Sequence, residues 1–399
     1  MKVAIVCDWL TNVGGAEKVL LEIHRLYPEA PIYTSKYSRK GIDWFSDADV
    51  RTGWLQIFPV FLRRFLGPLR QRWFSHLNLS EYDLVISVTG AEAKAVSAPN
   101  GMHVCYCHVP TQYYWQMYDE YVANPGFGIL NPLVRVCFKA LVMPLRAADF
   151  KAASKVDYFV TISEYARELI GKYYKREAIV IHPPVEIDDF KAGPDAHILS
   201  RAASPRPVAT GEARSSSPCQ APEALRKNDE HHPPYYYITT SRQVTWKRLD
   251  LAVKACLKAG RQLLVVGEGP EHKNLVKMAG GSELIKFVPL AGKKKLAEYL
   301  AGAKGYLFPS LEPFGIAPVE ALVTGCPVIA FGKGGALDYV VDGKNGVLFE
   351  KQSVNSLIDG ILRFEKMKFD RAKVSRSADG FSVARFDDEL VEFVNEKIK

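Results

Sequence analysis

Short apolar runs and longer amphipathic segments alternate along the whole chain. In the first half the apolar runs predict strands at 2–7, 30–35, 84–89, 103–108, 157–162 and 178–182, and the amphipathic segments predict helices at 16–27, about 58–75, 130–153 and 164–174. In the second half the same patterns predict strands at 235–240, 262–267, 284–289, 305–309 and 327–331, and helices at 247–259, 271–279, 293–302, 316–324, 353–367 and 383–398. This alternation indicates parallel sheets covered on both faces, so we expect an α/β protein with two Rossmann-like, doubly wound domains.

The joint between the two halves is visible in the composition. Residues 191–234 contain seven prolines and a Ser/Ala/Arg-rich tract, and they show no apolar period. Such a segment cannot bury a core, so it predicts a flexible insert in the interdomain linker. We therefore expect domains at 1–190 and 235–380, with a last segment at 381–399.

Composition and charge exclude several classes of protein. Hydrophobic residues make up 48% of the 399 residues and the net charge is +8, which is ordinary for a globular protein and does not call for a nucleic-acid partner. Seven scattered cysteines favour reduced thiols over a disulfide framework. No signal-peptide pattern opens the chain and no apolar run reaches the roughly 20 residues of a membrane span, so we expect a cytoplasmic protein.

Two loops that follow predicted strands of the second half could bind an anion. Arg242 and Lys247 lie five residues apart on one strand-to-helix loop, where both cations could reach a diphosphate at the helix N-terminus. Gly267, after the next strand, allows a ligand to approach the backbone closely. The dinucleotide-binding fingerprint is incomplete here, because Pro270 follows Gly269 and the third glycine is missing.

The strongest pattern follows the predicted strand 305–309. Gly315 permits a tight turn at a helix start, where the N–H groups of Phe314, Gly315 and Ile316 would point toward an anion or a sugar. Glu312 and Glu320 flank this turn. Carboxylates beside an anion site are explained if they accept hydrogen bonds from hydroxyl groups, so the pattern favours a sugar and a ribose.

Together these motifs resemble glycosyltransferase family 4, whose members are retaining enzymes of the GT-B fold with two Rossmann-like domains facing across a cleft. Glu312 and Glu320 match the E-x7-E motif of that family, and Arg242 and Lys247 match its Arg-x4-Lys pair. Gly14-Gly15 resembles the glycine loop of its N-terminal domain.

Further sequence segments resemble one subgroup of this family. His108 stands where the family carries an active-site histidine, and the runs 108–115 and 332–337 are similar to bacterial GDP-mannose-dependent mannosyltransferases of polysaccharide and O-antigen assembly. The resemblance implies an N-terminal acceptor-binding domain, a C-terminal nucleotide-sugar-binding domain and a last helix that crosses back to the first domain. A peripheral place at the inner face of the membrane is a separate expectation, which rests on the stretch 54–79 described below.

The resemblance assigns a role to each matched residue of the C-terminal domain. Glu312 would bind hydroxyls of the donor sugar, while the N–H groups of Phe314, Gly315 and Ile316 would contact the sugar and the β-phosphate. Glu320 would hold the ribose. The remaining donor contacts would come from the diphosphate-binding cations Arg242 and Lys247 and from Val288 beside the base. Gly267 joins the donor-binding residues on its position after a strand alone.

Two matched residues belong to the N-terminal domain. The N–H of Gly15 would touch the diphosphate when the cleft closes, and His108 would lie beside the transferred sugar. None of the matched positions offers a carboxylate nucleophile, so the resemblance implies a same-face displacement in which the departing phosphate oxygen takes the acceptor proton. No cofactor is expected beyond the donor, which is GDP-mannose or another nucleoside-diphosphate sugar.

Three other readings stay open. The donor could be a UDP-sugar, or the chain could be a non-catalytic GT-B partner subunit, although the intact cations and carboxylates argue against decay. A Rossmann oxidoreductase would need the missing glycine fingerprint. No metal site is expected, because Asp47 and Asp49 do not follow an apolar strand and Cys105 and Cys107 lack a second ligand pair.

The stretch 54–79 combines aromatic residues with arginines and contains no acid. Such a stretch could lie on an anionic bilayer, which would suit a polyprenyl-diphosphate-linked acceptor as well as a free glycan. The alternative is a helix that packs on the core and leaves its arginines in solvent.

Overall fold

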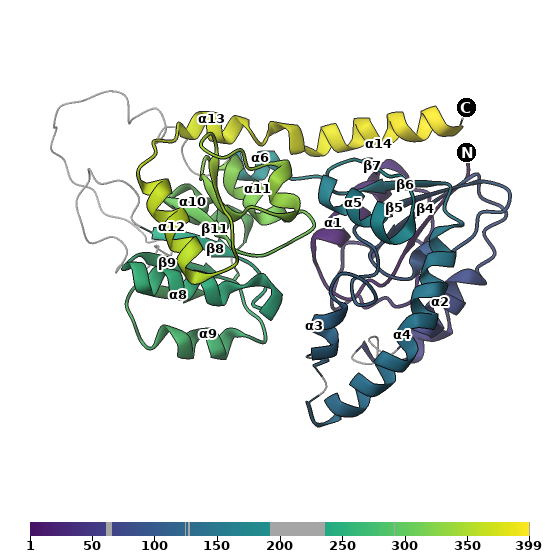
Figure 1. The fold of residues 1–399 in the computed structure, drawn as a ribbon. Coiled ribbons are helices and arrows are strands. Elements are labelled where there is room, and N and C mark those ends of the chain that lie inside the picture. The colour runs from purple at the N-terminus through teal and green to yellow at the C-terminus, as the bar shows by residue number, and fades with distance from the viewer. Residues whose placement is uncertain (61–65, 124, 127, 192–235, 291, 399) are drawn as a thin grey trace.

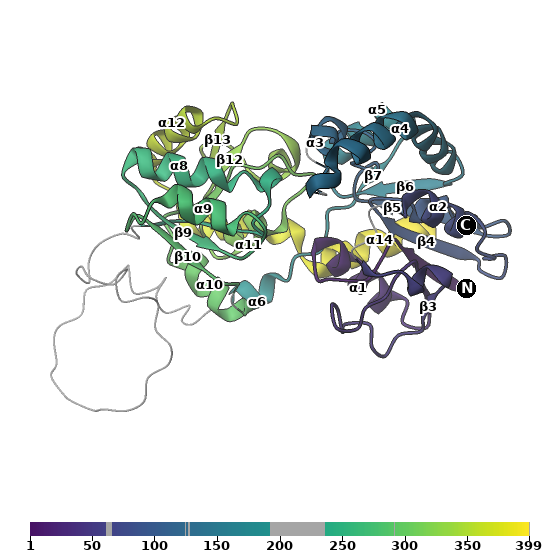
Figure 2. The ribbon, with the colours of Figure 1, turned by 90° about the horizontal axis from the view of Figure 1, so that it is seen from below.

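Two α/β domains, each built on one parallel sheet, make up the protein (Figure 1). The computed structural model describes residues 1–60, 66–123, 125–126, 128–191, 236–290 and 292–398. Apart from Lys191, the predicted insert at 191–234 lies outside the described residues. The predicted α/β class with two doubly wound domains is confirmed, and Figure 2 shows helices on both faces of the sheets.

The N-terminal sheet has the strand order β3-β2-β1-β4-β5-β6-β7, and every pair is parallel. Its strands are β1 (Val3–Cys7), β2 (Ile32–Thr34), β3 (Val50–Thr52), β4 (Leu84–Thr89), β5 (Met102–Cys107), β6 (Tyr158–Thr161) and β7 (Ile179–Val180). Its helices are α1 (Gly15–Leu26), α2 (Gly67–Ser75), α3 (Tyr118–Ala123), α4 (Asn131–Ala153) and α5 (Glu164–Tyr174), with short turns η1 (Trp54–Ile57), η3 (Ala93–Ala95) and η4 (Gly128–Leu130). The central strands β1 and β4 are buried throughout because helices cover both faces.

The C-terminal sheet has the order β10-β9-β8-β11-β12-β13 and is also parallel. Its strands are β8 (Tyr236–Thr240), β9 (Gln262–Val266), β10 (Ile285–Val288), β11 (Gly305–Phe308), β12 (Val328–Phe331) and β13 (Gly346–Phe349). Its helices are α8 (Leu249–Ala259), α9 (His272–Ala279), α10 (Lys293–Ala301), α11 (Ile316–Val323), α12 (Val354–Glu365) and α13 (Arg371–Arg376), with turns η6 (Thr245–Lys247), η7 (Gly334–Asp338) and η8 (Asp379–Phe381). In both sheets the strand order reverses beside the first strand, which places a crevice at the carboxyl ends of the strands.

Two connections join the domains. The first leads into α6 (Ile187–Lys191), which packs on α10 and α11 of the C-terminal domain, so residue 190, our expected boundary, lies inside that helix. The second leads into α14 (Val383–Ile398), which runs back along the N-terminal domain in both ribbon views (Figures 1 and 2). The two connections run side by side, since the Val185 N–H donates to the Phe381 carbonyl at 2.9 Å.

One predicted helix was too long. The stretch expected to be helical from about 58 to 75 follows the turn η1, and its described helix, α2, begins only at Gly67 with Pro68 in its first turn. Residues 61–65 lie outside the described residues. The short strands β3 and β13 were not predicted at all.

No helix in the described ranges has both the length and the apolar character needed to pass through a bilayer.

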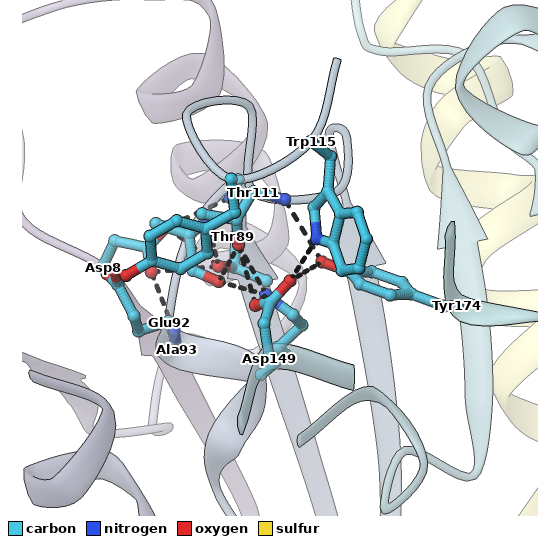
Figure 3. Close-up of polar contacts among 12 residues, drawn as sticks. Asp8, Thr89, Glu92, Ala93, Thr111, Trp115, Asp149 and Tyr174 are labelled. Carbon is cyan, nitrogen blue, oxygen red and sulfur yellow. Dashed lines mark hydrogen bonds and ion pairs between the residues drawn. The ribbon is translucent and has the colours of Figure 1, made fainter. Parts of the chain in front are cut away.

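A buried ion pair ties α4 to the N-terminal sheet (Figure 3). Lys94 Nζ lies 2.6 Å from Asp149 Oδ1, and both side chains are almost fully buried. Asp149 also accepts hydrogen bonds from Trp115 Nε1 at 2.7 Å and from the Tyr174 hydroxyl at 2.8 Å. Burial alone would lower the pKa of Lys94, but Asp149 and Tyr174 outweigh it, so that pKa lies well above its ordinary value.

A second buried pair lies beside the first. Arg70 Nη2 contacts Glu92 Oε2 at 2.9 Å, and Arg70 is only 4% exposed. Asp8, at the end of β1, accepts from the Thr89 hydroxyl and from the Ala93 N–H at 2.8 Å each, and its burial raises its pKa. These pairs fix the loops at the carboxyl ends of β1, β4 and β5.

We predict that Lys94→Met destabilises the protein by about 3–5 kcal/mol, because it leaves the buried Asp149 carboxylate without its cation. Thermal or urea unfolding measures this loss. As a control, Lys2→Met removes an exposed pair with Glu81 and should change stability by about 0.5 kcal/mol or less. Equal effects of the two substitutions would contradict the prediction.

Candidate functional site

An open hollow of about 290 Å³ lies at the carboxyl ends of β8 and β11. Open α/β sheets generally bind their ligands at this edge. Strand ends, the loop after β8 and the start of α11 form its wall. The lining residues are Thr239, Thr240, Ser241, Lys247, Leu249, Tyr306, Phe308, Pro309, Ser310, Glu312, Gly315, Ile316, Ala317 and Pro318. Four residues that we selected from the sequence therefore line the same hollow: Lys247, Glu312, Gly315 and Ile316.

Lys247 and Glu312 form an ion pair in this hollow. Lys247 Nζ contacts Glu312 Oε2 at 2.5 Å, although the residues are 65 positions apart. Glu312 Oε1 accepts a hydrogen bond from the Ser310 hydroxyl at 2.7 Å. Glu312 is 8% exposed, so its charge would be costly without these partners. Sequence reasoning missed Ser310, although it stands two residues before Glu312 in the same motif.

The start of α11 leaves N–H groups open toward the hollow. Gly315 precedes the helix with φ +93°, and a Cβ there would lie 2.6 Å from Phe308 Cζ, so the turn requires glycine. None of the N–H groups of Phe314, Gly315 and Ile316 donates to another group in the described part of the chain. The helix dipole adds positive potential at the same place, which suits an anion.

The carbonyl of Phe314 is held from the other side. It accepts a hydrogen bond from the Tyr339 hydroxyl at 2.8 Å, and the buried Phe314 ring stacks on His182 with ring centroids 5.6 Å apart. The Phe314 side chain is thus part of the packing between the domains, whereas its N–H makes no hydrogen bond to a described residue.

Arg242 lies on the loop after β8 but does not line the hollow. It is exposed, and its guanidinium makes no hydrogen bond or ion pair with any described residue. The loop is fixed by the next one, because the Gln243 N–H donates to the Glu268 carbonyl at 2.8 Å. An exposed cation without a partner among the described residues is free to pair with a ligand that enters the hollow.

Gly267 and Val288 lie together at the ends of β9 and β10. The Gly267 N–H donates to the Val288 carbonyl at 2.9 Å. Gly267 has φ +121°, and a Cβ there would lie 2.2 Å from the Ser241 carbonyl oxygen, so a side chain would push the two loops apart. These two residues are neighbours of the Arg242 loop and do not line the hollow itself.

Glu320 is paired with a lysine of the other domain. Lys18 of α1 places its Nζ 3.0 Å from Glu320 Oε1 and 3.6 Å from Glu186 Oε2. Glu320 is 7% exposed. Sequence reasoning missed Lys18, and the signal that could have found it is its place four residues after Gly14 in the glycine loop.

The glycine loop touches the start of α11. A Cβ on Gly15 would lie 3.1 Å from Ile316 Cδ1, so the absence of a side chain lets the two loops meet. The structure thus brings Gly15 of the N-terminal domain next to the lining of the hollow.

Asp338 joins the domains at a further point. Its Oδ2 accepts from the Glu164 N–H, at the first turn of α5, at 2.9 Å and lies 3.6 Å from His182 Nδ1. A carboxylate is favourable at a helix N-terminus, so this contact stabilises the present arrangement of the domains.

His108 follows β5 and does not line the hollow. Its N–H donates to the Thr89 carbonyl at 2.8 Å, and its ring packs edge-on against Tyr106. Burial lowers the pKa of His108 to about 4, so the ring is neutral at neutral pH. Nε2 is buried and has no hydrogen-bond partner in the described part of the chain.

Comparison with known proteins finds a family model for the C-terminal domain and a shared fold for the whole chain. Residues 220–380 match the family model described as glycosyl transferases group 1. The chain is 17% identical to the Anabaena protein HepE, solved in complex with UDP, with a TM-score of 0.69 and coverage of 99% of this chain and 100% of that one. This likeness shows the fold, and the fold is GT-B.

The curated relatives are matched over only part of the chain or at an identity of 25% or less. Glycogen synthase of Thermus thermophilus is 34% identical over 128 residues, which is 30% of this chain and 29% of that protein. The alpha-1,3/1,6-mannosyltransferase of Schizosaccharomyces pombe is 23% identical over 84% of this chain and 68% of its own length. A GDP-mannose-dependent phosphatidylinositol monomannoside mannosyltransferase of Mycolicibacterium smegmatis is 25% identical over 54% of this chain and 55% of its own length.

We predict that Lys247→Ala weakens the binding of inorganic pyrophosphate by at least about tenfold, because it removes a charge-assisted contact and leaves Glu312 as an unpaired anion. Isothermal calorimetry measures the affinity. Lys254→Ala is the control, since Lys254 is half exposed on α8 beside Asp250. Unchanged pyrophosphate affinity in the folded Lys247 variant would mean that the hollow is not the anion site.

Proposed function

We propose that this chain, whose C-terminal domain matches the group 1 glycosyl transferases and whose two domains form the GT-B fold, is a retaining glycosyltransferase that uses a nucleoside-diphosphate sugar. The donor we propose is GDP-mannose. The observation that carries the proposal is the Lys247–Glu312 pair, which sets a cation and a hydroxyl-binding carboxylate side by side at the open N-terminus of α11.

Donor binding would exchange the partners of this pair. The diphosphate would take over the charge of Lys247 and the N–H groups at the start of α11, and Arg242 would approach from its exposed position on the same loop. Glu312, released from Lys247, would accept hydrogen bonds from hydroxyls of the donor sugar. Each buried charge then keeps a partner before and after binding, which avoids an unpaired carboxylate.

The same exchange would occur at Glu320. Its carboxylate would accept hydrogen bonds from the ribose hydroxyls, while Lys18 keeps contact with Glu186. Gly267 and Val288, at the ends of β9 and β10, would border the base. The binding of the nucleotide would therefore change an interdomain contact.

The chemistry would take place at the sugar C1 atom. Its bond to the phosphate oxygen breaks through an oxocarbenium-like transition state, in which negative charge grows on the leaving diphosphate. Lys247, Arg242 and the fixed N–H groups therefore stabilise the transition state, which has the larger negative charge, more than they stabilise the ground state. The acceptor hydroxyl attacks from the same face and gives its proton to the departing phosphate oxygen, and the neutral His108 ring or its carbonyl lies beside the transferred sugar.

We propose mannose as the transferred sugar because of what the relatives named above transfer. Two of them carry mannosyltransferase in their names, and one of these is GDP-mannose-dependent. We propose a glycan or a polyprenyl-diphosphate-linked saccharide of bacterial surface polysaccharide synthesis as the acceptor, bound by the N-terminal domain.

The stretch 54–79 offers only part of the membrane surface that its composition suggested. Trp54 and Ile57 are 48% and 77% exposed, but Leu55 and Phe74 are buried in the domain. Arg70 is paired with Glu92 and is not available to lipid. Peripheral membrane association stays part of the proposal, with Trp54 and Ile57 as the most exposed of the described large apolar side chains in this stretch.

We expect GDP to raise the midpoint of thermal unfolding more than UDP, ADP or NAD does at equal concentration. A ligand at about 100 times its Kd stabilises the folded state by about 2.7 kcal/mol, which a thermal-shift assay detects. A larger shift with UDP would mean that the donor is a UDP-sugar, and the proposed sugar transfer would stand. A shift with NAD alone would refute the proposal.

We expect Arg242→Ala to lower kcat for sugar transfer by about 100- to 1,000-fold, because it removes a cation from the leaving diphosphate. Turnover of GDP-mannose, measured by release of GDP with a glycan acceptor extract, checks this. Lys254→Ala is again the control. A folded Arg242 variant with near-normal turnover would show that the cation is not part of the transferring site.

A further inference from the structure

The helix α4 exposes its apolar face to solvent, which is the reverse of an ordinary amphipathic surface helix. Of its twelve exposed positions ten are apolar, whereas a surface helix normally exposes polar residues. These apolar positions are Pro132, Leu133, Val136, Cys137, Ala140, Leu141, Met143, Pro144, Ala147 and Phe150. The larger side chains are far from buried, since Leu133, Val136 and Met143 are 63%, 66% and 65% exposed.

Two polar residues of α4, Arg146 and Asp149, are held by the body of the domain and fix this orientation. Asp149 lies in the buried network with Lys94, Trp115 and Tyr174 (Figure 3). Arg146 donates to the Tyr114 carbonyl at 2.6 Å, and its guanidinium lies 5.2 Å from the Trp115 ring centroid. Rotating the helix to bury its apolar face would break these contacts, so the exposed apolar face is a stable feature of the fold.

The exposed charges of α4 itself have one sign, while Asp119 and Glu120 are exposed on the neighbouring α3. Arg135 and Arg146 donate to backbone carbonyls of the protein. Lys139 and Lys151 are the two charged residues among the exposed positions of α4. Figure 1 shows α3 and the first half of α4 extending beyond the N-terminal sheet, which leaves the face open to a large partner.

We infer that the outer face of α4 docks on an anionic lipid bilayer. The helix has 23 residues. It is therefore about 35 Å long, and it would lie in the plane of the interface with its apolar side chains among the acyl chains. The cations at its flanks would meet the anionic headgroups.

A second copy of the chain fits this face less well. In an isologous dimer the same face would meet itself, and it contains no acid to pair with Lys139 or Arg135. The inference does not depend on sugar transfer, because it concerns binding to lipid alone. It differs from the stretch 54–79 in its residues and can be tested separately.

The test is flotation of the purified chain with vesicles of phosphatidylcholine alone or mixed with phosphatidylglycerol. We expect binding to the mixed vesicles that weakens with added salt. The double variant Val136→Glu with Met143→Glu should lower the partition coefficient by at least about tenfold, since both apolar contacts are lost and two like charges are added. Lys139→Gln should lower it by about fivefold.

The matched control places two glutamates on exposed apolar positions of the other domain. Val276→Glu with Leu362→Glu, at 44% and 42% exposure on α9 and α12, should bind vesicles like the wild type. Unfolding midpoints and pyrophosphate affinity of all variants should match the wild type, which separates loss of docking from loss of fold or of the donor site.

Three outcomes would overturn the inference. The wild type could fail to float with the mixed vesicles, or the α4 double variant could float as well as the wild type. The chain could also be a dimer that the α4 substitutions dissociate, with no vesicle binding by either form, which would assign the face to a second copy. None of these outcomes bears on pyrophosphate binding or sugar transfer.

Discussion

Two nearly buried carboxylates, Glu312 and Glu320, flank the start of α11, and a buried carboxylate without a partner is costly. Lys247 supplies one from the same domain, and Lys18 supplies the other across the domain boundary. The arrangement of the site follows from this requirement, because it brings the loop after β8 to the hollow and holds α1 against the C-terminal domain. Carboxylates paired in this way are ready to accept hydroxyl hydrogen bonds once a diphosphate takes over the role of partner.

The sequence predicted most of the fold because long buried strands leave an unmistakable apolar run. β1 and β4 show it throughout, and the alternation with helices then determined two parallel sheets. The short strands β3 and β13 escaped prediction for physical reasons. β3 has three residues and lies half exposed at the sheet edge, and β13 starts with a glycine, so neither carries enough apolar periodicity to be seen.

The contacts of the site within the C-terminal domain could be predicted from the sequence, whereas the contacts between the two domains could not. Lys247 and Glu312 belong to spaced motifs on loops after strands, and parallel strands bring such loops to one edge, where the structure finds the pair. Lys18 and Glu320 are 302 positions apart and lie in different domains, so no spacing in the sequence relates them. Ser310 was missed for a different reason, since a hydroxyl beside an acid has no distinctive pattern until its direction is known.

The helix α4 shows why a periodic pattern is not enough to orient an element. The sequence predicted a helix at 130–153 correctly, but an apolar stripe alone favours burial of that stripe. In the folded chain the opposite face is buried, because Asp149 pairs with Lys94 and accepts from Trp115. Arg146 donates to the Tyr114 carbonyl on the same side. Separating a buried charge from its partner is strongly destabilising. Leaving a leucine or methionine exposed forgoes only the free energy that burial of that side chain would contribute. The direction of the helix is thus decided by its few polar residues, and the apolar ones remain available for contact with lipid.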